Sequence, residues 1–116
     1  LYTANPYTTA STTYTSGSAN QVSGTGYTTG GNTLNNPVVA NQTNVATLTF
    51  DQTQWTSATF GAAFGAIYDN TAGDKLVVVL DFGGTKSCSN GTFTITFPST
   101  SSGAPAGTDS LISITS

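Results

Sequence analysis

Threonine, serine, glycine and asparagine dominate this chain and decide which secondary structure it can form. The sequence holds 24 Thr, 13 Ser, 13 Gly and 9 Asn among 116 residues, which is about half of the chain. Thr is β-branched and fits a strand, whereas Gly, Asn and Ser favour turns and loops. The usual helix formers are mostly scarce. The composition therefore predicts an all-β fold.

Disordered low complexity is the other interpretation of such a composition. Disordered segments usually combine high net charge with few aromatic residues, but here the net charge is −3 and there are 6 Phe, 5 Tyr and 1 Trp. A hydrophobic core can therefore form. We expect a single domain over residues 1–116, with an irregular, loop-rich part at 1–44 and the main strand-bearing core at 45–116.

The scarcity of charge excludes whole classes of function. Only 6% of residues are charged, against a typical value of about 25%. The chain has no His, so Ser-His and Cys-His catalytic arrangements and Cys/His zinc sites cannot form within it. Two Lys and no Arg cannot supply the phosphate contacts that nucleic-acid binding requires, and Cys88 alone cannot close an intrachain disulfide. We expect no enzyme and no catalytic, cofactor-binding or metal-binding residues.

Strand patterns are clearest in the second half of the chain. Strands are expected at residues 37–40, 45–50, 60–68, 75–82, 92–97 and 111–115. The turn residues at 69–74 predict an antiparallel hairpin between the third and fourth of these strands. Short strands at this spacing indicate an antiparallel β-sandwich, jelly-roll-like in topology, or a partly closed barrel. No run of 18 apolar residues is present, so we expect no transmembrane helix and no membrane partner.

Three details of these strands can be tested. Residues 76–80 are apolar at every position, which predicts a central strand that is buried on both faces. Gly83–Gly91 is rich in Gly and Ser and is expected to be a long loop. Phe93, Ile95 and Phe97 alternate with threonines, so the aromatic and aliphatic side chains should face the core and the threonines should face solvent.

The acidic residues offer two candidate sites, and each has a simpler interpretation. Asp69, Asn70 and Asp74 could give oxygen ligands to Ca²⁺, but a calcium site needs 6–8 oxygens, and these residue types also form ordinary hairpin turns. Asp69 and Asp81 could form the carboxylate pair of a glycosidase. Asp81, however, lies far along its strand from the turn, so we favour the structural interpretation in both cases.

The other conspicuous residues also have structural interpretations. Lys75 and Lys86 fit solvated charges or guards of a strand edge. Cys88 has no neighbouring base to activate its thiol. The segment 24–31 has the glycines of a phosphate loop, but it lacks a preceding apolar strand, a following helix and a Lys. Asn90-Gly91-Thr92 and Asn41-Gln42-Thr43 match the glycosylation pattern, which is common in any Asn/Thr-rich chain.

Several segments, taken in order, resemble a family of small tailed-bacteriophage virion proteins. The resemblance lies in Leu1–Thr3, in Val22–Leu34 (V-S-G-T-G-Y-T-x-G-G-x-x-L), in Phe64–Leu76, in Leu80–Gly84 and in Ser89–Phe97. Family members also carry an Arg before the strand where this chain has Gly61–Phe64, so an interface using that Arg is not expected here. The resemblance implies a structural component of the virion, either a capsid decoration (cement) protein or a tail or fibre part. The implied partners are the major capsid protein and copies of the chain itself.

Two further hypotheses stay open. One is a host-surface binding module at a tail or fibre tip, with aromatic sugar contacts at Tyr2, Tyr7, Tyr14, Tyr27 and Trp55. The other is an extracellular filament subunit that donates residues 1–16 to a neighbour's sheet. A surface rich in Thr, Ser and Asn can form many neutral hydrogen bonds with little salt dependence, and strand edges with few lysines invite pairing with another chain.

Overall fold

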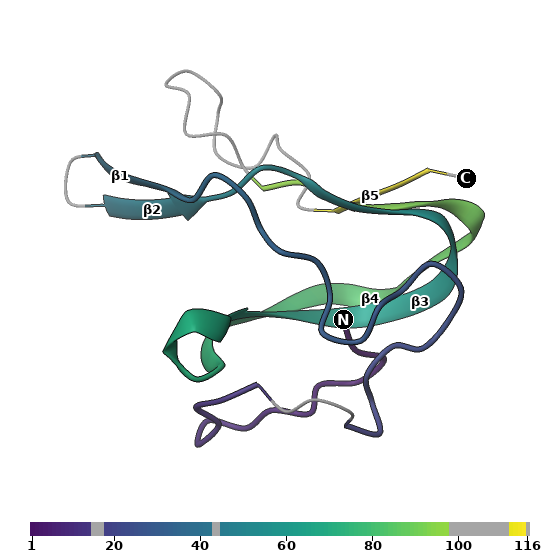
Figure 1. Ribbon diagram of the computed structural model, residues 1–116, viewed down its shortest axis with the longest axis horizontal. Helices are drawn as coiled ribbons and strands as arrows, with labels where there is room; N and C mark the ends of the chain where they lie inside the picture. The colour runs from purple at the N-terminus through teal and green to yellow at the C-terminus, as the bar shows by residue number, and fades with distance from the viewer. Residues whose placement is uncertain (15–17, 43–44, 98–111, 116) are drawn as a thin grey trace.

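The computed structural model describes residues 1–14, 18–42, 45–97 and 112–115 (Figure 1). Their elements, in order, are β1 (Val38–Gln42), β2 (Val45–Thr49), β3 (Thr53–Asp69), the 3₁₀ turn η1 (Asn70–Ala72), β4 (Lys75–Ile95) and β5 (Ile112–Thr115). β1 and β2 form one sheet, and β3, β4 and β5 form another in the order β3-β4-β5, with every pairing antiparallel. The prediction of an antiparallel β fold is confirmed. Within these described ranges, the two sheets show neither a sandwich nor a jelly roll.

The hairpin of β3 and β4 holds most of the strand residues. Its register runs from Asp69↔Lys75 beside the turn to Thr53↔Ile95 at the far end. Gly73 ends η1 in the left-handed conformation, with φ 74°, so the turn expected at 69–74 and its hairpin are confirmed. In Figure 1 the paired strands curve back sharply, and the two ends of the same ribbon lie one above the other.

The sharp bend coincides with irregularities in the ladder. The register shifts between Trp55 and Ala58 and again between Ala58 and Phe60. Ser57 and Asn90, one on each strand in this region, both have φ 49°. Such bulges increase local twist and bend a strand, so these two left-handed residues help to fold the ribbon over.

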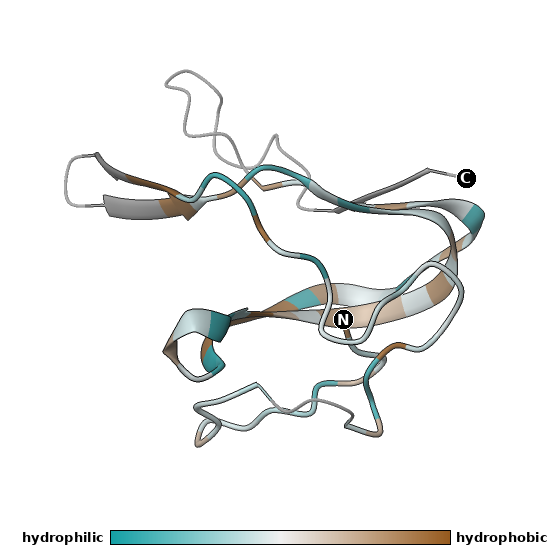
Figure 2. Ribbon diagram, viewed as in Figure 1, coloured by the Kyte–Doolittle hydropathy of each residue, from teal (hydrophilic) through white to brown (hydrophobic). Residues whose placement is uncertain are grey.

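The core lies inside this bend. Its aromatic members are Trp55, Phe60, Phe82 and Phe93, and Phe93 is fully buried. Ring centroids lie 5.0 Å apart for Phe60 and Phe93 and 6.4 Å apart for Phe82 and Phe93. Since Phe82 and Phe93 belong to different halves of β4, their contact joins the two halves of the ribbon. Figure 2 shows that hydrophobic segments are short and recur on the β1–β2 hairpin and on the β3–β4 ribbon.

The N-terminal part lies against the edges of the ribbon through isolated bridges. Tyr2 pairs with Phe64 of β3, Thr25 pairs with Thr59 of β3, and Thr13 pairs with Lys75 of β4. The close approach at Thr59 requires a glycine, because a Cβ on Gly24 would lie 2.5 Å from the Thr59 carbonyl oxygen.

The expected loop at Gly83–Gly91 is wrong, because these residues belong to β4. Phe60↔Cys88 and Ala62↔Lys86 are cross-strand pairs, so the segment continues the ladder. Between Ala62 and Phe64 of β3, the partner residue on β4 moves from Lys86 to Asp81. Gly83 and Gly84, with φ 72° and 136°, lie in the resulting bulge. The glycines therefore mark an irregularity within a strand and not its end.

The expected burial of residues 76–80 on both faces is also wrong. Val77 is 53% exposed and Val78 41% exposed, so the described residues leave both faces of this half of β4 partly uncovered. Phe93 and Ile95 face the core as predicted. Thr94 is buried against the prediction, since β4 lies there between β3 and β5.

Replacing Ser57 with glycine should stabilise the protein. Ser57 is exposed and has φ 49°. This left-handed conformation costs a residue with a Cβ about 1–2 kcal/mol, a strain that glycine does not have. Because glycine also gives the unfolded chain more entropy, which reduces this gain, we expect the free energy of unfolding to rise by about 0.5 kcal/mol. The measurement is the free energy of unfolding in urea. Thr56→Gly, at the exposed extended position next to it, is the matched control and should lose about 1 kcal/mol. Equal losses in both variants would contradict the prediction.

Candidate functional site

A cavity of about 690 Å³ lies between the two ends of the folded ribbon. Its lining includes Leu1, the crossing segment 29–34, residues from β2 to the start of β3, the hairpin end of β3 and β4, and the end of β4 with Phe97. Because the ribbon folds back on itself, residues distant in sequence meet here. The cavity is therefore a product of the bend.

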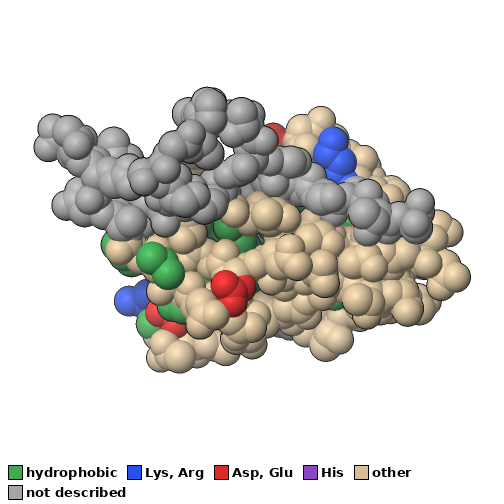
Figure 3. Space-filling model, turned by 90° about the horizontal axis from the view of Figure 1, so that it is seen from above, with side chains coloured by type: hydrophobic (Ala, Val, Ile, Leu, Met, Phe, Trp, Pro, Cys, Tyr) green, Lys and Arg blue, Asp and Glu red, His purple; other side chains and the backbone are tan. Residues whose placement is uncertain are grey.

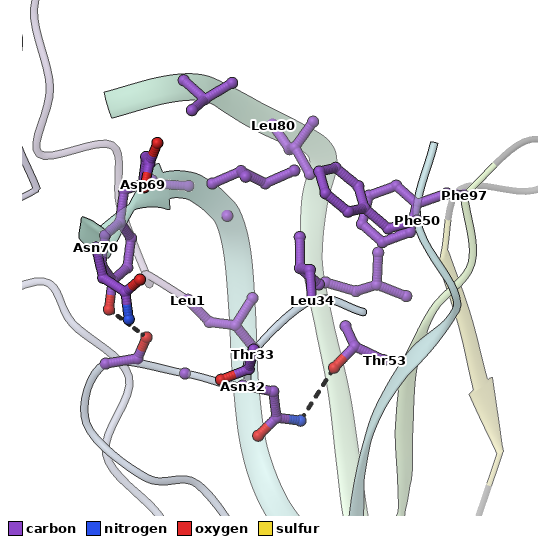
Figure 4. A pocket seen from close by; sticks show the side chains of 18 of the residues that line it. Leu1, Asn32, Thr33, Leu34, Phe50, Thr53, Asp69, Asn70, Leu80 and Phe97 are labelled. Atoms are coloured by element: carbon purple, nitrogen blue, oxygen red, sulfur yellow. Dashed lines mark hydrogen bonds between the residues drawn. The ribbon is translucent and has the colours of Figure 1, made fainter. Parts of the chain in front are cut away.

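The cavity has an apolar wall and a polar rim. Figure 4 shows Leu34, Phe50, Phe97 and Leu80 gathered on one side, with Asp69 and Asn70 on the opposite side. The Phe50 and Phe97 rings meet edge to face at a centroid distance of 5.3 Å. The lining includes one carboxylate, from Asp69, and no lysine. Such a surface is suited to neutral ligands or to another neutral protein surface.

Asn32 fixes the segment that crosses the cavity. Its Nδ2 donates to Thr53 Oγ1 at 3.1 Å and to the Gln54 carbonyl oxygen at 2.8 Å. The Tyr68 hydroxyl donates to the Gly30 carbonyl oxygen at 3.0 Å. These bonds tie segment 29–34 to both ends of β3. No sequence pattern distinguished Asn32 from the other asparagines.

Exposed aliphatic side chains flank the cavity. On the β1–β2 hairpin, hereafter the arm, Val38 is 48% exposed, Val39 75% and Leu48 46%. On β4, Val77 and Val78 are exposed as well, and Leu48 and Val77 also line the cavity. Within the described residues, the strands of the arm pair only with each other. Because a two-stranded hairpin is marginal alone in water, this arm is suited to packing against a partner.

The five tyrosines of the chain gather at the N-terminal part. The Tyr2 and Tyr7 hydroxyl oxygens form a hydrogen bond of 2.6 Å. The Tyr14 and Tyr68 rings stack with their centroids 4.1 Å apart. Tyr27 packs edge to face on Phe60. The spread of these tyrosines along the sequence gave no sign that they meet.

The aromatic residues considered as sugar contacts are therefore largely internal. Tyr2 is 1% exposed and Trp55 6%. Trp55 packs against Tyr27 and Phe93 with centroids 6.0 Å away in each case. Tyr7 and Tyr14 remain half-buried. The structure places these five residues in the core and in the tyrosine cluster, and they do not form a shared exposed platform.

Burial raises the pKa of several of these phenols. It raises the pKa of Tyr2, to which the Tyr7 hydrogen bond adds. Burial likewise raises the pKa of Tyr27 and of Tyr68. The folded protein therefore holds these protons more tightly than the unfolded chain does.

The acidic candidates take structural roles. Asp69 Oδ1 accepts hydrogen bonds from the Thr71 backbone N–H at 2.9 Å and from the Thr71 hydroxyl at 2.6 Å, and these bonds hold the pKa of the Asp69 carboxyl below its usual value. Asp81 Oδ1 accepts from the Gly83 N–H at 2.8 Å. Asp81 lies opposite Phe64 of β3, and Phe64 is five positions before Asp69. Five strand residues span roughly 16 Å, which separates Asp69 from the position opposite Asp81. The structure does not bring the proposed carboxylate pair together.

The structure also shows where the possible calcium ligands, Cys88 and the two lysines lie. Asp69, Asn70 and Asp74 lie in or beside the exposed hairpin turn. Within the part of the chain that the structure describes, no three His, Cys, Asp or Glu side chains cluster as a metal site would need. Cys88 is buried, and its Sγ donates to the Phe60 carbonyl oxygen at 3.7 Å. Lys75 is exposed and Lys86 half-buried.

The glycine-rich segment 24–31 and the glycosylation pattern at Asn90 both lie along the β3–β4 ribbon. Segment 24–31 contributes the bridge of Thr25 to Thr59, and no helix follows it in residues 32–42. Asn90 is exposed at the bend, and its N–H donates to Thr59 Oγ1 at 2.9 Å. The side chain of Asn41 lies outside the described residues.

No protein-family model, curated protein or solved structure matches this chain significantly. Nor does any helix among the described residues have the length and apolar character needed to cross a membrane. What the protein does must be inferred from its own surface and contacts.

Alkaline pH should destabilise the protein through the tyrosine cluster. Because the folded-state pKa of Tyr2, Tyr27 and Tyr68 is raised, their contribution to stability is full below the unfolded-state pKa of about 10 and falls as the pH rises above it. The urea midpoint should therefore be lower at about pH 11 than at about pH 9, a range above that in which the Leu1 amine titrates, whose pKa burial lowers to about 5.

Tyr2→Phe tests the origin of this effect. The variant should lose about 1 kcal/mol at neutral pH with the Tyr7 hydrogen bond, yet show a shallower decline at alkaline pH. Thr3→Val, at an exposed neighbouring position, serves as the control and should keep the full decline. A Tyr2→Phe decline as steep as that of the unmodified protein would argue against the assignment.

Proposed function

We propose that this chain is a non-enzymatic structural protein of a bacteriophage virion, a capsid decoration (cement) protein that binds the major capsid protein and copies of itself. The resemblance of five ordered segments to small tailed-phage virion proteins supports this assignment. Its location would be the assembled particle, after synthesis in the host cytoplasm.

The observation that carries the proposal is the exposed apolar arm. Val38, Val39 and Leu48 lie on a hairpin that pairs with no other described strand, and Val77 and Val78 add apolar surface on β4. Covering apolar side chains as exposed as Val39, at 75%, with a partner surface would be favourable. A protein that is stable on a lattice can keep such surface, because neighbouring subunits cover it.

The neutrality of the surface fits the same function. In Figure 3 the described part of one face is mostly neutral, with a few acidic and basic groups. Contacts made by Thr, Ser and Asn depend little on ionic strength, because salt screens charges and not neutral hydrogen bonds. Low charge also leaves little repulsion between copies. We further propose that the two facing halves of the β3–β4 ribbon are the two layers of a jelly-roll-like β-sandwich.

A binding experiment with capsids tests the proposal. Purified protein is mixed with capsids from phage that lack it, and bound protein is measured after sedimentation. Val39→Asp should reduce capsid binding by about tenfold or more, because a carboxylate in an apolar contact loses its hydration. Thr85→Asp adds the same charge at an exposed position of β4 remote in sequence from the arm and should bind normally.

Both variants need a folding control, and two results would contradict the proposal. Val39 lies outside the core, so both variants should keep the unmodified circular dichroism spectrum. Equal binding by Val39→Asp and the unmodified protein would remove the arm from the interface. Recovery of the protein only in the tail fraction of dissociated virions would overturn the decoration function.

A host-surface binding module at the tail or fibre is the second candidate, and the cavity favours it. Its apolar wall and its few polar groups are features of sites for small ligands. A glycan array probed with the isolated protein tests this function, and loss of a signal in Asn32→Ala would locate the ligand in the cavity. Filament assembly by strand donation receives less support, because Tyr2 and Thr13 already pair with β3 and β4 of their own chain.

A further inference from the structure

Two tyrosines from distant parts of the chain form a parallel stack. Tyr14 follows the N-terminal segment that lies on the edge of β4, and Tyr68 is near the end of β3. Their ring centroids are 4.1 Å apart, and the ring planes differ by 5°. The other tyrosine ring pair, Tyr2 and Tyr7, has its planes at 85°. The stack therefore brings the ring carbons of Tyr14 and Tyr68 close to van der Waals contact.

Hydrogen bonds hold both rings in place. The Tyr14 backbone N–H donates to the Asp74 carbonyl oxygen at 2.8 Å, and Gln21 Nε2 donates to the Tyr14 hydroxyl at 3.0 Å. The Tyr68 hydroxyl is anchored on the Gly30 carbonyl oxygen. Both side chains are half-buried, so a small oxidant in solution can reach them.

The geometry points to Tyr14 and Tyr68 as a site of oxidative cross-linking that joins the N-terminal segment to β3 as dityrosine. Each phenol gives up one electron and one proton to an oxidant of the peroxide class, used by a peroxidase. The two phenoxyl radicals then form a carbon–carbon bond between ring positions ortho to the hydroxyls. The ortho hydrogens move to the oxygens and restore both phenols. Two tyrosines and one hydrogen peroxide thus give one dityrosine and two waters.

Proximity decides which pair reacts. Holding two reactive groups in contact raises their effective concentration by several orders of magnitude over a bimolecular encounter, so this pair should couple before tyrosines of different molecules meet. Burial raises the pKa of Tyr68, with Tyr14 and Asp74 adding to the effect. Its proton therefore remains on the phenol at neutral pH and is released when the oxidant takes the electron.

The bond would fasten a segment that is otherwise held by few contacts. The bridge of Thr13 to Lys75 and the hydrogen bond of the Leu76 N–H to the Thr12 carbonyl oxygen, at 2.9 Å, fix this part of the chain to β4. A covalent link at the next residue would prevent its release. In an extracellular particle exposed to oxidants, such a link would increase the resistance of each subunit to unfolding.

The sequence makes the test specific. The folded full chain is oxidised at low concentration with a ruthenium photosensitiser and persulfate, in which persulfate accepts the two electrons. It is then digested with a protease that cleaves before Asp. This releases residues 1–50, which contain four of the five tyrosines, and residues 51–68, which contain only Tyr68. A linked pair of these fragments, lighter by two hydrogens and derived from the monomer band, is the expected product.

Ring-retaining variants identify the partner of Tyr68. Tyr14→Phe keeps the stack but lacks the oxidisable phenol, and it should reduce the linked fragments by about tenfold or more. Tyr7→Phe removes another tyrosine from the same fragment and should leave the yield unchanged. Circular dichroism confirms that both variants fold. Unchanged linkage in Tyr14→Phe, linkage only between separate molecules, or no dityrosine where free tyrosine couples would each overturn the proposal.

Discussion

The pairing of β3 with β4 is the interaction on which the rest of the structure depends. This one antiparallel ladder runs from the turn at Asp69 and Lys75 to Thr53 and Ile95, and its bend encloses the core and the cavity. Phe82 and Phe93 can touch only because the ribbon folds back. Regular strands twist gently, whereas bulges and left-handed residues allow a sharp change of direction. The irregular positions in the ladder are therefore as important to the fold as the regular ones.

Local patterns in the sequence predicted the hairpin but not its extent. The turn at 69–74 and the alternation of Phe93 and Ile95 are properties of a few neighbouring residues, and both predictions are confirmed. Gly83–Gly91 has the composition of a loop, yet its residues pair with β3 at positions distant in sequence. Composition carries no information about such a partner. The cavity could not be predicted for the same reason, since the bend that creates it depends on two residues with φ 49°.

Val77 and Val78 lie in an apolar run that predicted burial, yet both side chains are exposed. A continuous apolar run predicts burial on both faces of a sheet, but burial by a partner subunit satisfies the same pattern. In the described chain these side chains are exposed. Their exposure, together with that of Val39 on the arm, is what links the fold to the proposed assembly. The apolar pattern is consistent with an intermolecular contact that a single chain does not contain.

The tyrosines compensate for a small aliphatic core. Among the residues whose burial the structure describes, few large aliphatic side chains are buried, and rings such as Tyr2 and Tyr27 from the N-terminal part add to the packing. A phenol brings a large apolar area but also a hydroxyl that needs a partner when buried. The bond between the Tyr2 and Tyr7 hydroxyls meets this need. A chain with almost no charged residues thus fixes its N-terminal part with neutral hydrogen bonds and ring contacts, which depend little on charge screening by salt.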